Sequence, residues 1–317
     1  MNKEQQEFID AALKGDNIFL TGAGGTGKSF IIGELISRYK NSGHSYGLTA
    51  MTGCAALLIG HSATTLHSWA CVGLGKEPAS KLVSGIRKSQ RGMRRWLLTD
   101  TLIVDEVSMM APDFFEKLDL VAKKIHNSSK PFGNLQVIFV GDFFQLPPIN
   151  KESSDSNDRE FIFESPLWAQ MNFKVIELTE IMRQRDPVFH KILYEARHGK
   201  MTKESLEILQ GRQNLNWKKL EIKPTLLFPQ KAIVTSINSQ NLNKLPGNQY
   251  SYKVSTVIAT AGPIDINSPH VKYAIEKTNR DAQYDEEVLL KVGAQVMLLV
   301  NMQKTESNAL EIGRAHV

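Results

Sequence analysis

A glycine-rich segment near the start of the chain has the residue types and spacing that hold phosphate groups. Residues 22–29 read GAGGTGKS and fit the pattern G-x-x-x-x-G-K-[ST]. An apolar run at 17–21 precedes them and apolar residues at helical spacing follow at 30–36, which predicts a strand, a loop and a helix. Backbone N–H groups would point at phosphates, Lys28 would neutralise their charge and Ser29 would bind Mg²⁺. The residues expected to contact a nucleotide here are Gly22, Gly24, Gly25, Thr26, Gly27, Lys28 and Ser29. A glycine-rich turn without a ligand is the alternative, and the flanking strand and helix argue against it.

An acidic pair follows a later apolar run. Residues 101–104 read TLIV, and Asp105 and Glu106 come directly after them. Behind a strand of a phosphate-binding sheet, Asp105 would hold Mg²⁺, directly or through water, and Glu106 would accept a proton from the attacking water. A solvated surface pair is the alternative, which the phosphate-binding loop in the same predicted sheet makes weaker.

Another polar segment, GDFFQLPP at 141–148, follows the apolar run at 135–140. Gln145 could sense a γ-phosphate and orient water, as a glutamine does in small GTPases. Phe143 and Phe144 are an aromatic pair beside this predicted site. We expect at least one ring to pack in the core and the other to be available to a nucleic-acid base, so both are candidate DNA contacts.

A basic run separates the first of these segments from the acidic pair. Its excess of six positive charges is larger than the net charge of +5 of the whole chain. The basic residues, with Glu77 as the one acid among them, are Lys76, Lys81, Arg87, Lys88, Arg91, Arg94 and Arg95. Such a run predicts an arm that contacts nucleic-acid phosphates, and a solvated face is the alternative. We expect Trp96, at the end of the run, to pack in the core; stacking on a nucleic-acid base is the alternative.

The polar segments all follow apolar runs, and these runs alternate with helical patterns. Strands that are apolar throughout predict a parallel sheet covered by helices on both faces, an α/β fold in which ligands bind at the carboxyl ends of the strands. A helix over 4–14 and a strand over 46–50 extend the pattern. Beyond residue 180 a strand at 224–228, a helix at 232–245 and a strand at 292–299 indicate a second unit, and 247–279 stays unassigned.

Composition limits the class of protein. The 317 residues can form two domains, and 42% hydrophobic with 22% charged residues is ordinary for a globular protein. The two cysteines, Cys54 and Cys71, form no C-x-x-C pair, which argues against a disulfide scaffold or a zinc site and fits a reducing, intracellular compartment. The sequence has no apolar run of membrane-spanning length, and its polar start lacks a signal-peptide core. The polar stretch 151–160 is typical of a surface loop.

The order of these segments resembles a superfamily 1 helicase of the Pif-one type (petite integration frequency), a group of 5′→3′ DNA helicases. The match runs over about residues 3–303, and its most specific part is LDLVA at 118–122 continuing through KPFG at 130–133. The further matching segments are NKEQ at 2–5, TAMTGCAA at 49–56, TTLHS at 64–68, DEVSM at 105–109 and LTEIMRQ at 178–184.

The resemblance implies roles for residues that the pattern alone leaves open. Gln5 would read adenine, and Thr52, Gly53 and His67 would contact single-stranded DNA. Arg183 would be an arginine finger on the γ-phosphate, acting from the second domain. A capped loop histidine and a surface arginine are the alternatives for His67 and Arg183.

The resemblance also implies the domain organisation. Residues 1–179 would form a RecA-like domain, with the basic arm at about 71–98, and residues 180–310 a partial second RecA-like domain. In the family, two further sequence motifs, numbered V and VI, follow the segment that matches residues 292–299. Neither motif is found in this sequence. Residues 311–317, EIGRAHV, resemble a translated sequencing adapter, which indicates a foreign tail and a truncated gene.

These observations predict an ATP-dependent 5′→3′ DNA helicase that uses Mg²⁺ and acts, as a monomer, on single-stranded DNA and duplex junctions, with no membrane partner. A DNA-stimulated ATPase that clamps DNA without unwinding it is the main alternative. A small-molecule kinase is a weaker one, because a kinase would not need the basic arm or the DNA-contact segments.

Overall fold

The computed structural model describes residues 1–148, 159–213, 215–216, 219, 221, 224–254, 265, 268–269, 271–272, 287–296 and 315–316. The chain divides into two compact units, Met1–Leu215 and Asn216–Val317. The first unit ends at Leu215, and the domain boundary expected at 179 stays a prediction.

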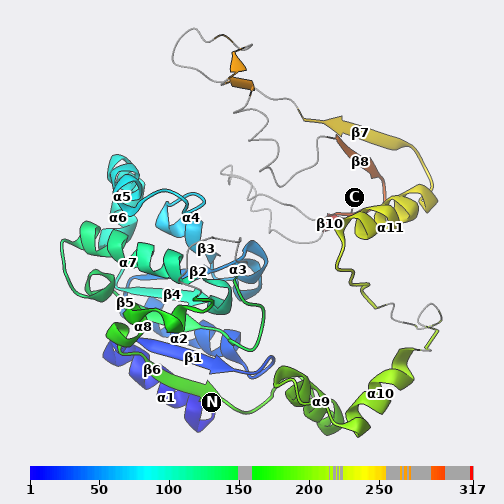
Figure 1. Cartoon of the computed structure of the whole chain (residues 1–317), viewed down its shortest axis with the longest axis horizontal. Helices are drawn as coiled ribbons and strands as arrows, with labels where there is room; N and C mark the ends of the chain where they lie inside the picture. The colour runs from blue at the N-terminus through cyan, green and yellow to red at the C-terminus, as the bar shows by residue number, and fades with distance from the viewer. Residues whose placement is uncertain are drawn as a thin grey trace. The chain divides into compact units, whose positions relative to one another are not determined.

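A six-stranded sheet forms the centre of the first unit, with the strand order β3-β2-β4-β5-β1-β6 (Figure 1). All five neighbouring pairs are parallel. The strands are β1 (Ile18–Gly22), β2 (Tyr46–Ala50), β3 (Thr64–Thr65), β4 (Thr101–Asp105), β5 (Gln136–Val140) and β6 (Lys174–Leu178). The predicted α/β fold with a parallel sheet is confirmed. Strand β6 was not predicted. It pairs with β1, the strand before the glycine-rich phosphate-binding loop at residues 22–29, which is called the P-loop from here on.

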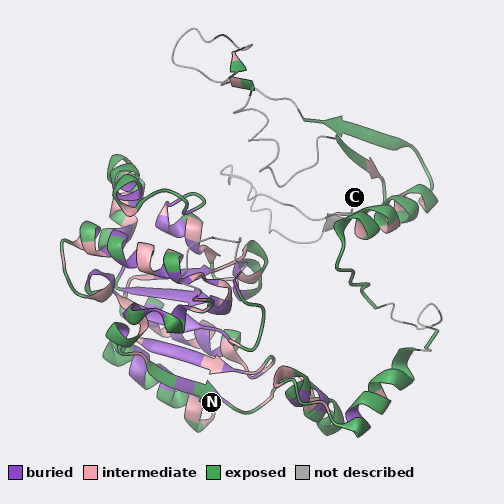
Figure 2. Ribbon diagram, in the orientation of Figure 1, coloured by how far each residue is buried: buried purple, intermediate pink, exposed green. Residues whose placement is uncertain are grey.

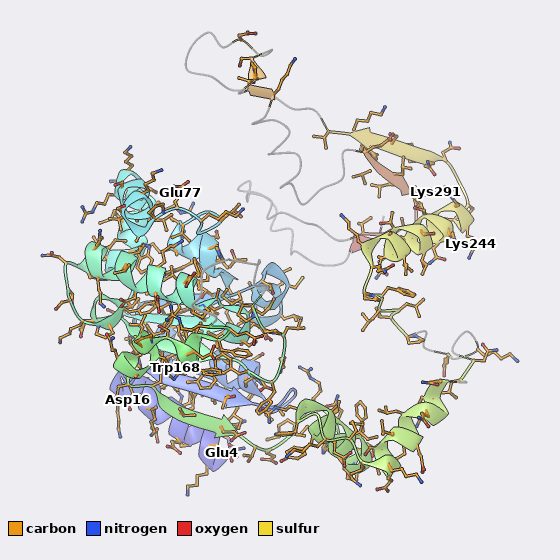
Figure 3. The ribbon with its side chains drawn as sticks, in the orientation of Figure 1. Glu4, Asp16, Glu77, Trp168, Lys244 and Lys291 are labelled. Carbon is orange, nitrogen blue, oxygen red and sulfur yellow. The ribbon has the colours of Figure 1, made fainter. Side chains whose placement is uncertain are left out.

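Helices cover both faces of this sheet, and the alternation of side chains along the strands explains why. Ile18 and Leu20 of β1 pack in one apolar cluster with helices α1, α2 and α3, whereas Phe19 packs in the other with α4 to α8. Trp168 of α8, which is labelled in Figure 3, packs against this second cluster, with its ring centre 5.3 Å from that of Phe19. The first unit contains the helices α1 (Lys3–Lys14), α2 (Lys28–Ser42), α3 (Gly53–Ile59), α4 (Leu66–Ala70), α5 (Ala79–Lys88), α6 (Gln90–Leu98), α7 (Pro112–His126), α8 (Pro166–Met171), α9 (Pro187–Arg197) and α10 (Lys203–Gln213). The last two, α9 and α10, contribute no residue to either cluster. Three short 3₁₀ helices are η1 (Val107–Met109), η2 (Pro131–Asn134) and η3 (Ile162–Glu164).

The second unit has little burial in its described part (Figure 2). Helix α11 (Lys231–Lys244) has no buried residue, and every residue of β7 (Gln249–Lys253) is exposed. Strand β7 pairs antiparallel with β8 (Glu287–Lys291), and β9 (Gln295–Val296) pairs antiparallel with β10 (Ala315–His316). The bounds of α11 agree to within one residue with the helix predicted at 232–245.

Two expectations for this part of the chain need correction. Residues 224–228 form no strand; Leu227 there is 88% exposed, so this apolar run has no sheet neighbour to pack against. Of the strand expected at 292–299, residues 292–294 lie in and just after a turn, Gln295–Val296 form the strand β9, and 297–299 lie outside the described residues. In the tail 311–317, Ala315 and His316 pair with β9. The rest of that tail, most of 247–279 and most of the loop 151–160 lie outside the described residues.

None of the helices in the described part of the chain combines the length and the apolar content that a membrane span needs.

Candidate nucleotide and nucleic-acid site

The predicted P-loop connects the carboxyl end of β1 to the first residue of α2. Gly22, Gly25 and Gly27 all have positive φ angles, of 142°, 87° and 91°, which turn the backbone in a way that residues with a Cβ rarely adopt. Thr26 is buried, and its hydroxyl donates to the Ala23 carbonyl at 2.9 Å, inside the loop. The loop therefore has the tight curvature and the helix N-terminus that bind phosphate.

Lys28 bends back over this loop. Its Nζ donates to the carbonyl oxygens of Gly22 at 2.6 Å and Ala23 at 3.0 Å. Burial lowers the pKa of Lys28, and the carboxylates of Asp142, Asp105 and Glu106 oppose that shift. Lys28 therefore lies inside the loop and feels the charge of three carboxyl groups. A lysine in this place can neutralise phosphate charge, and a carboxylate nearby can hold a metal ion.

Two further predicted residues lie against the loop. Gln5 of α1 is buried, and its amide nitrogen would lie 3.4 Å from a Cβ added at Gly27. Its amide oxygen is engaged by the backbone N–H of Asn2 in a capping box. The backbone N–H groups of Met182 and Arg183 donate to the Gly25 carbonyl at 2.8 and 3.2 Å. Arg183 belongs to the first compact unit, and its role as an arginine finger from a second domain stays a prediction.

The acidic pair ends β4. Asp105 is buried, and its Oδ1 accepts the backbone N–H of Glu106 at 2.9 Å. Burial raises the pKa of Asp105 from 3.8 to about 6; the Glu106 carboxylate adds to this rise, while its N–H and Lys28 oppose it. Glu106 has a left-handed backbone, with a φ of 55°, and is less buried than Asp105. The two carboxyl groups therefore differ in environment, as a metal ligand and a proton acceptor would.

The donor set fits Mg²⁺ bound together with a nucleotide. Ser29 has an exposed side chain on the first turn of α2, and Asp105 offers a carboxylate; both are oxygen ligands of the kind that Mg²⁺ prefers. Within the described ranges no three His, Cys, Asp or Glu side chains come together as a metal site of their own. Mg²⁺ in proteins usually keeps waters and takes the rest of its ligands from substrate phosphates, so one or two protein ligands are sufficient.

Asp142 and Gln145 follow β5 on the same edge of the sheet. The Gln145 amide nitrogen donates to Asp142 Oδ2 at 3.3 Å. Phe143 packs in an aromatic cluster, with ring centres 5.2 Å from Phe19 and 4.9 Å from Phe163, so it is the ring of the pair that packs in the core. Phe144 is 60% exposed, so its ring is the one open to a base.

The other candidate DNA contacts lie after neighbouring strands. Thr52 accepts the Ala55 N–H at 3.2 Å as the N-cap of α3, and Gly53 is exposed at the start of that helix. His67 stacks on Phe114, with ring centres 4.4 Å apart and nearly parallel, and burial lowers the pKa of His67. A histidine stacked in this way is well placed to hold Phe114, while Thr52 and Gly53 present backbone at the helix N-terminus.

The basic run forms helices α5 and α6. Trp96 is fully buried and donates to the Ala70 carbonyl at 3.0 Å, so it is a packing residue. Arg95 donates to the carbonyls of Ser68 and Trp69, at 2.9 and 2.7 Å. Glu77, labelled in Figure 3, pairs with Lys81 at the start of this arm.

A cavity of about 830 Å³ lies beside α6 and the start of β2. Arg91 and Arg94 line it, both are exposed, and neither forms an ion pair with any residue that the structure describes. These two arginines, unlike Arg95, are free to contact phosphate.

The segments that gave the most specific match prove to pack on each other. Asp119 of α7 is buried, and its Oδ1 accepts the Phe132 N–H at 2.7 Å, while Lys123 pairs with its other oxygen at 2.7 Å. A Cβ at Gly133, which has a φ of 63°, would lie 2.8 Å from the Ala122 carbonyl. This glycine allows η2 to approach α7. The segments 118–122 and 130–133 therefore form part of the apolar cluster that contains Phe19.

One residue of the site was missed from the sequence. Arg197, the last residue of α9, forms a two-pronged ion pair with the buried Asp142. The two residues are 55 positions apart, and no local pattern connects them. A lone arginine at the end of an amphipathic helix reads as a solvated residue, so only the fold could show the pairing.

Residues 1–211 match the model of the family described as PIF1-like helicase. The chain is 36% identical over 315 residues to the ATP-dependent DNA helicase PIF1 of Emericella nidulans, which covers 98% of this chain and 40% of that protein. It is 34% identical over 313 residues to the ATP-dependent DNA helicase RRM3 of Saccharomyces cerevisiae, covering 96% of this chain and 41% of that protein. The chain thus spans about two fifths of the length of these curated relatives.

The fold agrees with solved structures. The Pif1 helicase of Candida albicans gives a TM-score of 0.81 at 31% identity, over 96% of this chain and 66% of that one. Bacteroides Pif1 bound to ssDNA gives a TM-score of 0.72 at 27% identity, over 95% of this chain and 66% of that one. With the family model matched over two thirds of the chain, this chain belongs to the PIF1-like helicase family.

Proposed function

We propose that the protein is an ATP-dependent DNA helicase that moves 5′→3′ on single-stranded DNA and unwinds the duplex ahead of it. The observation that carries this proposal is the gathering of Lys28, Asp105, Asp142 and the Met182–Arg183 backbone around one P-loop. On the same edge of the sheet lie the exposed Phe144 and the N-terminus of α3, so a nucleotide and a DNA strand can bind side by side.

Each residue has a task that follows from its environment. The P-loop amides and Lys28 would bind the phosphates, and Ser29 and Asp105 would hold Mg²⁺, which when bound offsets the phosphate charge. Glu106 would hold the proton that the attacking water loses, and Gln145 would orient that water. Gln5 would contact the base, and Arg183 would stabilise charge that develops on the γ-phosphate.

The DNA side of the proposal assigns Thr52, Gly53 and Phe144 to the single strand, with Phe143 as their support from the core. The arginines of α6 would contact phosphates of DNA. His67 would act through Phe114, on which it stacks. In this proposal residues 1–179 are the first RecA-like domain, 180–310 the partial second one and 311–317 a foreign tail.

Structures of relatives support DNA as the partner. One solved structure is of Bacteroides Pif1 bound to ssDNA, and another concerns DNA unwinding at forked dsDNA by two coordinating Pif1 helicases. We propose single strands and duplex junctions as partners of this protein too. A monomer is the proposed state, and the two helicases on one fork make the stoichiometry on DNA a point for experiment.

ATP hydrolysis with and without single-stranded DNA tests the proposal first, with Lys28→Ala as the inactive control. Stimulation by DNA excludes a small-molecule kinase. Strand displacement in the same protein then separates a helicase from an ATPase that only clamps DNA. Stimulated hydrolysis without displacement by the full-length protein would replace the proposal with the clamp.

A further inference from the structure

Arg197 lies where the proposed nucleotide site and the proposed single-strand surface meet. Its Nε donates to Asp142 Oδ2 at 2.9 Å, and its Nη2 donates to Oδ1 at 3.0 Å. Its guanidinium carbon lies 4.5 Å from the centre of the Phe144 ring. One planar side chain therefore contacts a buried carboxylate on one side and an exposed aromatic ring on the other.

The contact with Asp142 connects Arg197 to the proposed phosphate site. Asp142 is 2% exposed, and it accepts three hydrogen bonds besides the two from Arg197. Its carboxylate accepts the Phe144 N–H at 3.1 Å and the Gln145 side-chain amide at 3.3 Å. Its backbone carbonyl accepts the Gln145 N–H at 2.9 Å. Its charge also acts on Lys28. A shift of Asp142 would therefore move Gln145 and change the field at Lys28.

The contact with Phe144 connects Arg197 to the proposed single-strand surface. Phe144 is 60% exposed and has Arg197 over its ring, with the His198 ring 5.0 Å from it. A guanidinium stacked on an aromatic ring is held by cation–π attraction. A base that stacks on Phe144 would fix the orientation of this ring, and with it the guanidinium.

Helix α9 is also connected to the P-loop, through the segment that precedes it. Gln184 follows the two residues that donate to Gly25, and its carbonyl contacts His190 Nε2 at 2.8 Å. Asp186 caps α9 by accepting the Val188 N–H at 2.9 Å. The last residue of α9 thus reaches Asp142 from a helix whose first turn is anchored beside the phosphate site.

We infer that Arg197 is a positioning residue that couples nucleotide binding at the P-loop to single-strand binding at Phe144. This inference rests on the proposed function. It goes further, because an ion pair that only held α9 in place would stabilise the fold without linking the two ligands. Linkage is measurable: if DNA tightens nucleotide binding by some factor, nucleotide tightens DNA binding by the same factor.

The test uses the 317-residue chain with Mg²⁺, a fluorescent non-hydrolysable ATP analogue and a labelled oligothymidylate. The dissociation constant of each ligand is measured alone and with the other at saturation, which gives the coupling factor twice. The variants are Arg197→Ala and Arg197→Lys; lysine keeps the charge but cannot make the two-pronged contact. Lys191→Ala is the matched control, since it removes a cation from α9 that pairs with the exposed Glu204.

We expect a coupling factor of at least about 5 in the unchanged chain and in Lys191→Ala, within the usual range for linked sites. It should fall to about 1 in Arg197→Ala and drop clearly in Arg197→Lys, while both variants still bind each ligand alone. If Arg197→Ala does not fold, Arg197→Lys decides. Equal coupling in all variants, or none in the unchanged chain, overturns the inference and leaves the proposed function standing. An unchanged chain that binds no nucleotide or no DNA overturns both.

Discussion

The backbone N–H of Arg183 donates to the carbonyl oxygen of Gly25 at 3.2 Å, and a Cβ added at Gly25 would lie 2.9 Å from the Arg183 Cβ. This contact places the predicted arginine finger on the P-loop from the same compact unit. Its side chain is exposed, and therefore free to swing towards a phosphate. The glycine is required here, because a larger residue would push this segment off the loop.

Replacing Arg183 should slow hydrolysis without weakening nucleotide binding. An arginine finger acts mainly on the charge of the transition state, and its loss costs roughly 10³–10⁵ in rate. We expect Arg183→Ala in the full-length protein to lower kcat steeply with KM little changed, in a steady-state ATPase assay. Arg185→Ala, two residues along and exposed, is the control. A variant that raised only KM would show ordinary ground-state binding instead.

The raised pKa of Asp105 predicts opposite effects on the fold and on metal binding. An ionised Asp105 is disfavoured in the fold, so its cost to stability is absent below pH 3.8 and complete above pH about 6. That rise corresponds to about 3 kcal/mol at most. Asp105→Asn should therefore raise the Tm of the nucleotide-free protein at pH 7.5, by a few degrees, and leave it nearly unchanged at pH 4.

The same variant should bind the ATP analogue with little benefit from Mg²⁺. In the unchanged protein that benefit should decline as the pH falls through about 6, because the carboxylate must lose its proton to bind the metal. Titrations with and without Mg²⁺ between pH 5 and 8 measure it. A magnesium effect that survived in Asp105→Asn would remove Asp105 from the metal site.

Neutralising the free part of the basic arm should weaken DNA binding and flatten its dependence on salt. Lys88, Arg91 and Arg94 are exposed, whereas Arg87 and Arg95 hydrogen-bond to backbone carbonyls and are left in place. Changing the three to glutamine should reduce the slope of log K against log salt by roughly 2, at about 0.7 per lost contact with a single strand. Fluorescence anisotropy over a range of salt concentrations measures this slope.

The matched control removes the same charge from elsewhere on the first unit. Lys3, Lys14 and Lys40 are exposed residues of α1 and α2. Changing them to glutamine should leave the slope within about 0.5 of its original value. Equal slopes in both triple variants would mean that the arm is a solvated face.

The second unit should be the first to be cut by a protease. Helix α11 has no buried residue, and strand β7 is exposed along its whole length, so local opening there costs little. Limited trypsin treatment of the 317-residue chain should leave a resistant fragment that ends near Leu215. Cleavage within the sheet of the first unit before any cut beyond residue 216 would contradict this expectation.

The parts of the fold that the sequence predicted are those where local pattern and chemistry coincide. The P-loop, Asp105 and the 141–148 segment each follow a short apolar run, and buried parallel strands require such runs. Strand β6 was missed because it is an edge strand with only Ile176 and Leu178 buried, which is too short an alternation to recognise. The expected strand at 224–228 was wrong for the opposite reason: its apolar run meets no neighbouring strand.

The arrangement around Asp142 could not be predicted from local pattern. Its ion pair with Arg197 depends on how α9 folds back to β5, which brings residues 55 positions apart into contact. The division of labour between Phe143 and Phe144 likewise depends on which ring faces Phe19 and Trp168. The sequence predicted that at least one ring packs, and the fold shows which one.

Strand displacement by the full-length protein on two matched duplexes, one with a 5′ single-stranded tail and one with a 3′ tail, tests the central proposal most directly. With ATP and Mg²⁺ we expect unwinding of the 5′-tailed duplex, little of the 3′-tailed one, and none of either in Lys28→Ala. Preference for the 3′ tail, or displacement that persists in Lys28→Ala, would contradict the proposal.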